Sequence, residues 1–221
     1  MITASYAQQF ANRTAIRQRL LKQKHLNSSY KIIDIGGSAF SWTGDIADVI
    51  VDLNSTRQED FCFNISNWWE WQPLLDHVNS QGKFDYAICT HTLEDLRDPC
   101  VTLHYLPQIA VQGVITVPTV EVEMSRIENL QWLGYIHHRY MFDFVDGSIV
   151  IAPKLEFLGG LISKQPHKVD RYNEIVFEWN RSISYTPFMN DYLGPDAATV
   201  VQRYRDWIES AVKKCQSASF G

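Results

Sequence analysis

Short apolar runs alternate with amphipathic stretches through the first half of the chain. Apolar residues at helical spacing predict a helix over residues 6–26, a second over 71–78, and a third that begins at Asp98-Pro99. Runs rich in β-branched residues predict buried strands over residues 31–35, 48–53, 61–65, 84–90 and 113–117. This alternation is typical of a parallel sheet covered by helices, so we predict an α/β fold.

The second half of the chain has a different pattern. Residues 140–145 and 148–152 flank Asp146-Gly147, which predicts a β-hairpin. A further strand is predicted over 174–179, and a helix with one apolar face over 197–214. No repeat or linker divides the 221 residues, a length that suits one substantial core. We therefore expect a single domain over residues 1–221.

Composition excludes several classes of protein. The chain is 45% hydrophobic and 20% charged, which is ordinary for a globular protein. Its net charge of −5 and the lack of a basic run argue against nucleic acid as a partner. Neither a signal peptide nor an apolar run of about 18 residues is present, so we expect a cytoplasmic protein with no membrane partner. The four cysteines show no metal-ligand spacing, and the oligomeric state is left open.

Polar or small residues follow each of the first four predicted strands. Ligands of an open parallel sheet bind beyond the carboxyl ends of its strands, so these residues are candidates for a cofactor site. Asp52 follows Asp34 at close to the ~20-residue spacing of a ribose-binding acid. Two glycines after the first strand would let a ligand approach the backbone. The candidates are Asp34, Gly36, Gly37, Ser38, Asp52, Asn64, Ile65, Thr90 and His91.

The chemistry of the first turn favours one cofactor over another. A dinucleotide site requires the pattern GxGxxG leading into a helix whose N-terminus holds the pyrophosphate. Residues 40–44 (FSWTG) form helices poorly, and the glycine pattern is missing. S-adenosylmethionine has no phosphate and carries a sulfonium and an ammonium group, which suit an acid-flanked turn. The residues therefore favour S-adenosylmethionine over NAD(P).

These motifs resemble the class I S-adenosylmethionine-dependent methyltransferases. Residues 31–38 (KIIDIGGS) are similar to the first glycine motif of that family, and Asp52 falls where its ribose acid lies. Residues 84–119 are similar to its fourth strand, next helix, glycine turn and fifth strand. The chain departs from the pattern in four places: Ser38 and Phe40 replace glycines, Asn64 stands where an acid often reaches the adenine, and Asp95 replaces a histidine.

The resemblance implies a Rossmann-like three-layer sandwich. Its mostly parallel seven-stranded sheet would end in an antiparallel pair, with which the hairpin in the C-terminal part is compatible. It also implies S-adenosylmethionine as cofactor, and it leaves room for an acceptor-binding insertion around residues 119–170.

The densest group of reactive side chains lies at residues 134–140 (GYIHHRY). We predict that His137 or His138 is the base that accepts a proton from a hydroxyl acceptor, and that Arg139 orients the acceptor. The alternative is that one histidine is packed in the core and the other is a solvated turn residue. Glu94 and Asp95 are interpreted as capping or solvated acids, so no metal site is expected.

The sequence thus predicts an enzyme that transfers a methyl group from S-adenosylmethionine to a small hydroxylated acceptor, with O-methyl transfer favoured. Two alternatives remain. One is a non-catalytic binding protein on a degenerate methyltransferase fold, which Ser38 and the short first helix permit. The other is an NAD(P)-dependent oxidoreductase, which the missing glycine pattern disfavours.

Overall fold

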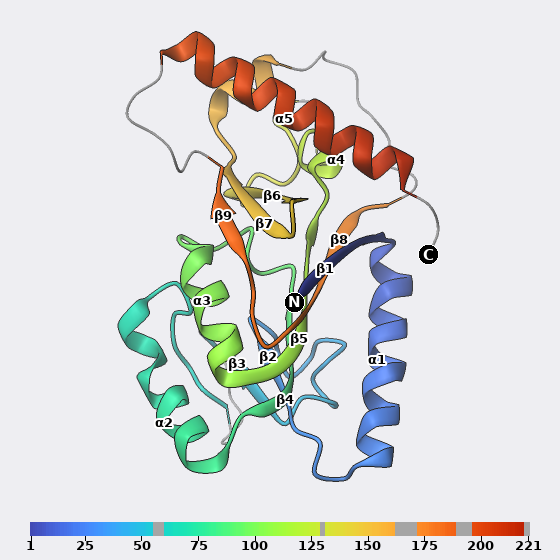
Figure 1. The fold of residues 1–221 in the computed structure, drawn as a ribbon, viewed down its shortest axis with the longest axis vertical. Helices are drawn as coiled ribbons and strands as arrows, with labels where there is room; N and C mark the ends of the chain where they lie inside the picture. The colour runs from blue at the N-terminus through green and yellow to red at the C-terminus, as the bar shows by residue number, and fades with distance from the viewer. Residues whose placement is uncertain (55–59, 129–130, 162–171, 189–195, 219–221) are drawn as a thin grey trace.

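The computed structural model describes residues 1–54, 60–128, 131–161, 172–188 and 196–218. A six-stranded mixed sheet, here called the main sheet, has the strand order β1-β8-β5-β4-β2-β3 (Figure 1). Strands β3, β2, β4 and β5 are parallel neighbours, and β8 runs antiparallel to both β5 and β1. The strands are β1 (Ile2–Ala7), β2 (Ile32–Ile35), β3 (Val49–Val51), β4 (Phe84–Thr90), β5 (Ala110–Pro118) and β8 (Glu174–Asn180).

The α/β prediction is confirmed, but the predicted seven-stranded sheet is not, because the main sheet has six strands in the described residues. The predicted strand at 61–65 contributes only an isolated parallel bridge between Val51 and Phe61. The antiparallel pair at the edge of the main sheet is formed by β8 and the N-terminal strand β1, which was not predicted. Local periodicity does not reveal β1 because its pairing partner lies more than 160 residues away in the sequence.

Helices cover both faces of the main sheet. Helix α1 (Gln9–Leu26) lies along one face, as Figure 1 shows, and Ile16 and Leu20 are its buried contacts there. The 3₁₀ helix η1 (Trp68–Trp71), α2 (Gln72–Gln81) and α3 (Pro99–Ile109) pack against the other. Alternate strand residues divide between these cores: Ile32 and Ile88 lie under α1, and their neighbours Ile33, Ala87 and Cys89 lie on the opposite side. This two-sided burial explains why the strands read as continuous apolar runs.

A second, smaller sheet has the order β6-β7-β9. The predicted hairpin is confirmed, and Asp146 (φ 50°) with Gly147 (φ 80°) forms its turn. It does not extend the main sheet, however. One of its faces, with Met141 and Ala152, packs against α5, which lies across it in Figure 1, and the other, with Phe142, Ile149 and Ile151, packs into the core of the main sheet. The elements of this region are α4 (Val120–Glu123), β6 (Tyr140–Val145), β7 (Ser148–Pro153), η2 (Glu156–Gly160), β9 (Tyr185–Pro187) and α5 (Ala197–Ser217).

The helix predicted over 197–214 is confirmed and extends to Ser217. Asp196 caps it through Thr199, and Tyr204, Trp207 and Ile208 form its buried face. Among the described helices, none combines the length and the apolar character that crossing a membrane requires.

Candidate functional site

The strand order of the main sheet creates a switch point at β2. Strand β3, which follows β2 in the sequence, lies on one side of it, and β4 lies on the other. At the carboxyl ends of these three strands is a cavity of about 290 Å³. A crevice at this position is where ligands of doubly wound sheets bind. The cavity is lined by Gly36, Val51, Asp52, Leu53, Phe63, Asn64, Ile65, His91, Thr92, Asp95 and Leu96.

Five of the nine predicted cofactor residues line this cavity: Gly36, Asp52, Asn64, Ile65 and His91. The other four, Asp34, Gly37, Ser38 and Thr90, are not part of its lining. The residues come together because the carboxyl ends of parallel strands meet at one edge of the sheet.

Gly36 is fixed as glycine by its surroundings. Its φ is +78°, and a Cβ built on it would lie 2.3 Å from Cγ2 of Thr92. Its backbone N–H donates to the carbonyl of Val51 at 2.7 Å. The backbone therefore forms this wall of the cavity with no side chain in between.

Asp34 has a different role from the one predicted. It is 3% exposed and accepts a hydrogen bond from the hydroxyl of Thr43. A Cβ on Gly37 would lie 1.9 Å from Oδ2 of Asp34, so the turn passes directly over this carboxyl group. Burial, with a contribution from Asp52, raises the pKa of Asp34 to about 6. Asp34 thus holds the turn that follows β2.

That turn contains no helix: the described residues 37–48 form only turns and irregular backbone. Arg17 of α1 holds it by donating to the carbonyl of Trp42 at 3.1 Å and to Asp45 at 2.5 Å. The predicted lack of a helix directly after the first glycines is confirmed. Consequently, no helix N-terminus is available there to bind a phosphate.

His91 lies between two fully buried carboxylates. Its Nε2 is 2.9 Å from Oε2 of Glu174, and its Nδ1 is 3.3 Å from Oε1 of Glu94. Burial by itself lowers the pKa of His91, but the bonds to Glu174 and Glu94 outweigh it and raise the pKa to about 9. The imidazole is therefore charged at neutral pH. The backbone of His91, at the end of β4, has a φ of 50°, which lies in the left-handed region.

The interpretation of Glu94 as a capping or solvated acid is wrong, since its side chain is 0% exposed. Asp95, its neighbour, is 43% exposed and lines the cavity. Glu174 was not predicted; it comes from β8 and also accepts a hydrogen bond from Asn12 of α1 at 2.5 Å. An isolated glutamate at the start of a strand has no local pattern that distinguishes it from a solvated one.

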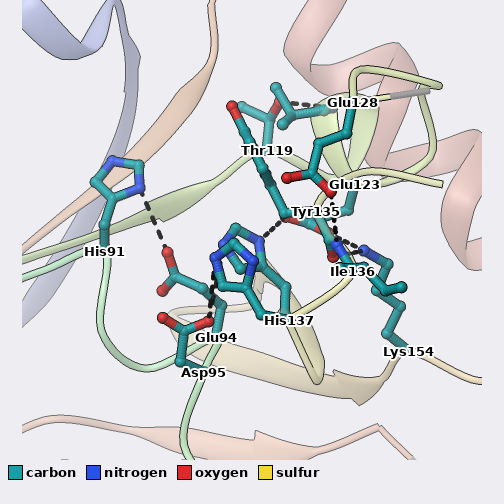
Figure 2. Close-up of polar contacts among 12 residues, drawn as sticks. His91, Glu94, Asp95, Thr119, Glu123, Glu128, Tyr135, Ile136, His137 and Lys154 are labelled. Atoms are coloured by element: carbon teal, nitrogen blue, oxygen red, sulfur yellow. Dashed lines mark hydrogen bonds and ion pairs between the residues drawn. The ribbon is translucent and has the colours of Figure 1, made fainter. Parts of the chain in front are cut away.

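The two predicted catalytic histidines lie close to Asp95. Both Nε2 atoms are 3.8 Å from Oδ1 of Asp95. His137 is 58% exposed, whereas His138 is 7% exposed and its Nδ1 is 2.5 Å from Oε1 of Glu123. Figure 2 shows Asp95 facing His137, with Glu123 and Lys154 beyond it.

Glu123 and Lys154 were not predicted, although they determine the position of His138. Lys154 Nζ lies 2.6 Å from Oε2 of Glu123 and donates to the carbonyl of Tyr135 at 2.8 Å (Figure 2). Arg139 exposes its side chain, while its backbone N–H donates to the carbonyl of Glu94 at 2.6 Å. Asp95 is thus the point at which the predicted catalytic cluster and the cavity meet.

Comparison with known proteins adds little. No family model matches the sequence, and no curated protein matches it significantly. A solved structure from Bacillus halodurans C-125, described as a "putative methyltransferase", shares 8% identity with this chain. That similarity covers 76% of this chain and 99% of the other, with a TM-score of 0.38.

Proposed function

We propose that this chain is a methyltransferase that binds S-adenosylmethionine and methylates a hydroxyl group of a small molecule. The observation that carries the proposal is the cavity at the switch point of the main sheet. It brings together an exposed backbone wall at Gly36, a carboxylate at Asp52 and a polar amide at Asn64. The carboxylate of Asp52 suits the ribose of an adenosyl ligand, because it can accept hydrogen bonds from the ribose hydroxyls. The amide of Asn64 suits the base, because its oxygen can accept a hydrogen bond from an amine.

The charges around the cavity favour this donor over a dinucleotide. Its acids are Asp52 and Asp95, and its described lining contains neither lysine nor arginine. The single cation, His91, is paired with Glu94 and Glu174. Such a lining attracts a sulfonium or ammonium group and repels a pyrophosphate. The apolar side chains of Leu53, Phe63 and Ile65 provide a surface for a flat heterocycle.

The cluster at His137 supports an acceptor with a hydroxyl group. When bound, the donor would supply an electrophilic methyl group to the hydroxyl oxygen, with S-adenosylhomocysteine as the leaving group. The exposed imidazole of His137, beside Asp95, accepts the hydroxyl proton. The exposed guanidinium of Arg139 orients the acceptor through its planar set of donors. The remaining contribution to catalysis is the alignment of the hydroxyl oxygen with the methyl group.

Calorimetric titration tests the donor directly. The protein is titrated in parallel with S-adenosylhomocysteine, S-adenosylmethionine, NAD⁺ and NADP⁺. We expect saturable binding of both adenosyl sulfur ligands and none of either dinucleotide. Binding of NAD⁺ or NADP⁺ without S-adenosylhomocysteine would indicate an oxidoreductase, and binding of none of them a protein that has lost its donor site. Either result contradicts the proposal.

A further inference from the structure

Three side chains beside the cavity present metal-ligating atoms to one another. Asp95, His137 and His138, here called the Asp–His cluster, each offer one ligand atom, and these three atoms lie within 4.8 Å of one another. Two of the separations, from Oδ1 of Asp95 to each Nε2, are 3.8 Å. Ligands of a tetrahedral ion with bonds of ~2.0–2.1 Å are about 3.3 Å apart, so each imidazole would need to approach Asp95 by about 0.5 Å.

His138 is held as metal-ligating histidines are held. Its Nδ1 contacts Glu123, which is 1% exposed, and its Nε2 points toward Asp95. A carboxylate on the far nitrogen fixes the orientation and tautomer of a ligating imidazole. Lys154 occupies the second oxygen of Glu123, so that carboxylate cannot turn away from His138 without losing an ion pair.

The backbone around the two histidines is fixed on both sides. Gly134 donates to the carbonyl of Ser125 at 2.6 Å, and Arg139 donates to that of Glu94 at 2.6 Å. Gly134 has a φ of +53°, and a Cβ there would lie 2.6 Å from Oε2 of Glu123. The turn therefore passes closely over Glu123, and this places the adjacent histidines against Asp95. His137 and His138 meet edge to face, with ring centroids 4.5 Å apart.

We propose that the Asp–His cluster binds a divalent transition-metal ion, with zinc as the best-matched ion. Two imidazoles and one carboxylate suit zinc and its first-row neighbours, whereas magnesium and calcium prefer oxygen ligands alone. Three protein ligands leave a coordination position open, which is the composition of catalytic rather than structural zinc sites. Because His137 is 58% exposed and Asp95 lines the cavity, the open position is accessible to a small molecule.

The metal site does not depend on methyl transfer. A metal-bound Nε2 of His137 cannot also accept a proton. If the proposed function also holds, the ion would therefore replace His137 in activating the acceptor, because a hydroxyl bound to the ion would lose its proton to solvent more easily than a free hydroxyl. That link, which rests on the proposed function, favours acceptors whose reactive oxygen can coordinate a metal.

Zinc binding tests the site without reference to activity. Protein stripped with a chelator is titrated with Zn²⁺ in competition with a metal indicator, and Co²⁺ absorption in the visible range reports the ligand geometry. We expect one equivalent to bind, and Asp95→Ala, His137→Ala and His138→Ala each to weaken zinc binding about 100-fold. Glu123→Gln, measured well below its melting temperature, should weaken it about 10–100-fold. His25→Ala, at an exposed histidine of α1, is the matched control and should bind as the unaltered chain does.

Equal zinc affinity in the unaltered chain and the three ligand variants would overturn the proposal, as would an equal loss in His25→Ala, because both indicate adventitious binding to surface histidines. Asp95→Ala and His137→Ala alter exposed side chains, so misfolding does not complicate them. Titration of the same zinc-free proteins with S-adenosylhomocysteine separates the two proposals. A protein that binds zinc but not this ligand would contradict the proposed function and leave the metal site standing.

Discussion

His91 carries its charge between Glu94 and Glu174, both of which are fully buried. Buried carboxylates are costly unless they are paired, and the paired imidazole offsets that cost only while it is protonated. The pKa of about 9 shows how strongly the pair outweighs the effect of burial on the imidazole. A residue at the edge of the cavity thus contributes to the stability of the whole fold.

This arrangement predicts a specific pH dependence of stability. In the unfolded chain His91 titrates near its ordinary value of about 6.5. Because its folded pKa is raised, its contribution is fully present below about pH 6.5 and is lost as the pH rises through about 9. We expect the free energy of unfolding to fall by on the order of 3 kcal/mol over that window. Urea denaturation at several pH values should show this decrease in the unaltered chain but not in His91→Gln. His104→Gln, at an exposed histidine, should keep it.

Asp52 is the residue on which the donor assignment depends most directly. If its carboxylate holds the ribose hydroxyls, Asp52→Ala should weaken S-adenosylhomocysteine binding by about 1.5–3 kcal/mol, the usual value of hydrogen bonds to a charged group. Calorimetry measures the loss, and Asp76→Ala, at an exposed aspartate of α2, provides the comparison. Unchanged affinity in a folded Asp52→Ala protein would remove the ribose assignment.

At the scale of elements, the turn after β2 matters because its backbone forms part of the cavity wall. Both Gly36 and Gly147 have φ near +80°, but only Gly36 has a neighbour that an added Cβ would strike. Alanine at either position should cost about 1–2 kcal/mol from the left-handed backbone alone. Gly36→Ala should in addition displace Thr92 and abolish S-adenosylhomocysteine binding, whereas Gly147→Ala should bind normally. Thermal denaturation and calorimetry on both variants measure the two effects. Normal binding by Gly36→Ala would show that the ligand does not approach this wall.

The elements differ in how far the sequence predicts them. The strands β2, β3, β4 and β5 and the helix α5 follow from local periodicity, because burial imposes the same spacing on any chain that forms them. Strands β1 and β9 do not, since both pair with partners far away in the sequence.

The candidate site divides in the same way. Gly36, Asp52 and His91 come together at the ends of neighbouring parallel strands, and their position was predictable from those strands. Three residues that hold its histidines were not predicted. Glu174 contacts His91, and Glu123, which is paired with Lys154, contacts His138. Their burial comes from packing between distant elements, and a lone charged residue shows no pattern that reveals it.

At the scale of the whole molecule, hydrogen bonds from residues 94–97 connect the cavity to the small sheet. The carbonyl of Glu94 accepts from the backbone N–H groups of Arg139 at 2.6 Å and Tyr140 at 3.3 Å. The hydroxyl of Tyr140 donates to the carbonyl of Arg97 at 3.0 Å. The start of β6 is thereby bonded to the loop that carries His91, Thr92 and Asp95 into the cavity. Ordering that loop should also order the first residues of β6.

Hydrogen exchange can test this connection. A ligand that binds the folded state suppresses opening of the segments it contacts and of those bonded to them. With saturating S-adenosylhomocysteine we expect slower amide exchange at residues 91–96 and, although no atom of the ligand need touch them, at 139–140. Residues 19–23 of α1, beside a different cavity lined by Arg19 and Tyr86, serve as the internal control and should be unaffected. Protection at 19–23 in place of 91–96 would put the ligand in that other cavity. Protection of 91–96 without 139–140 would show that the bonds at Glu94 do not couple the two sheets.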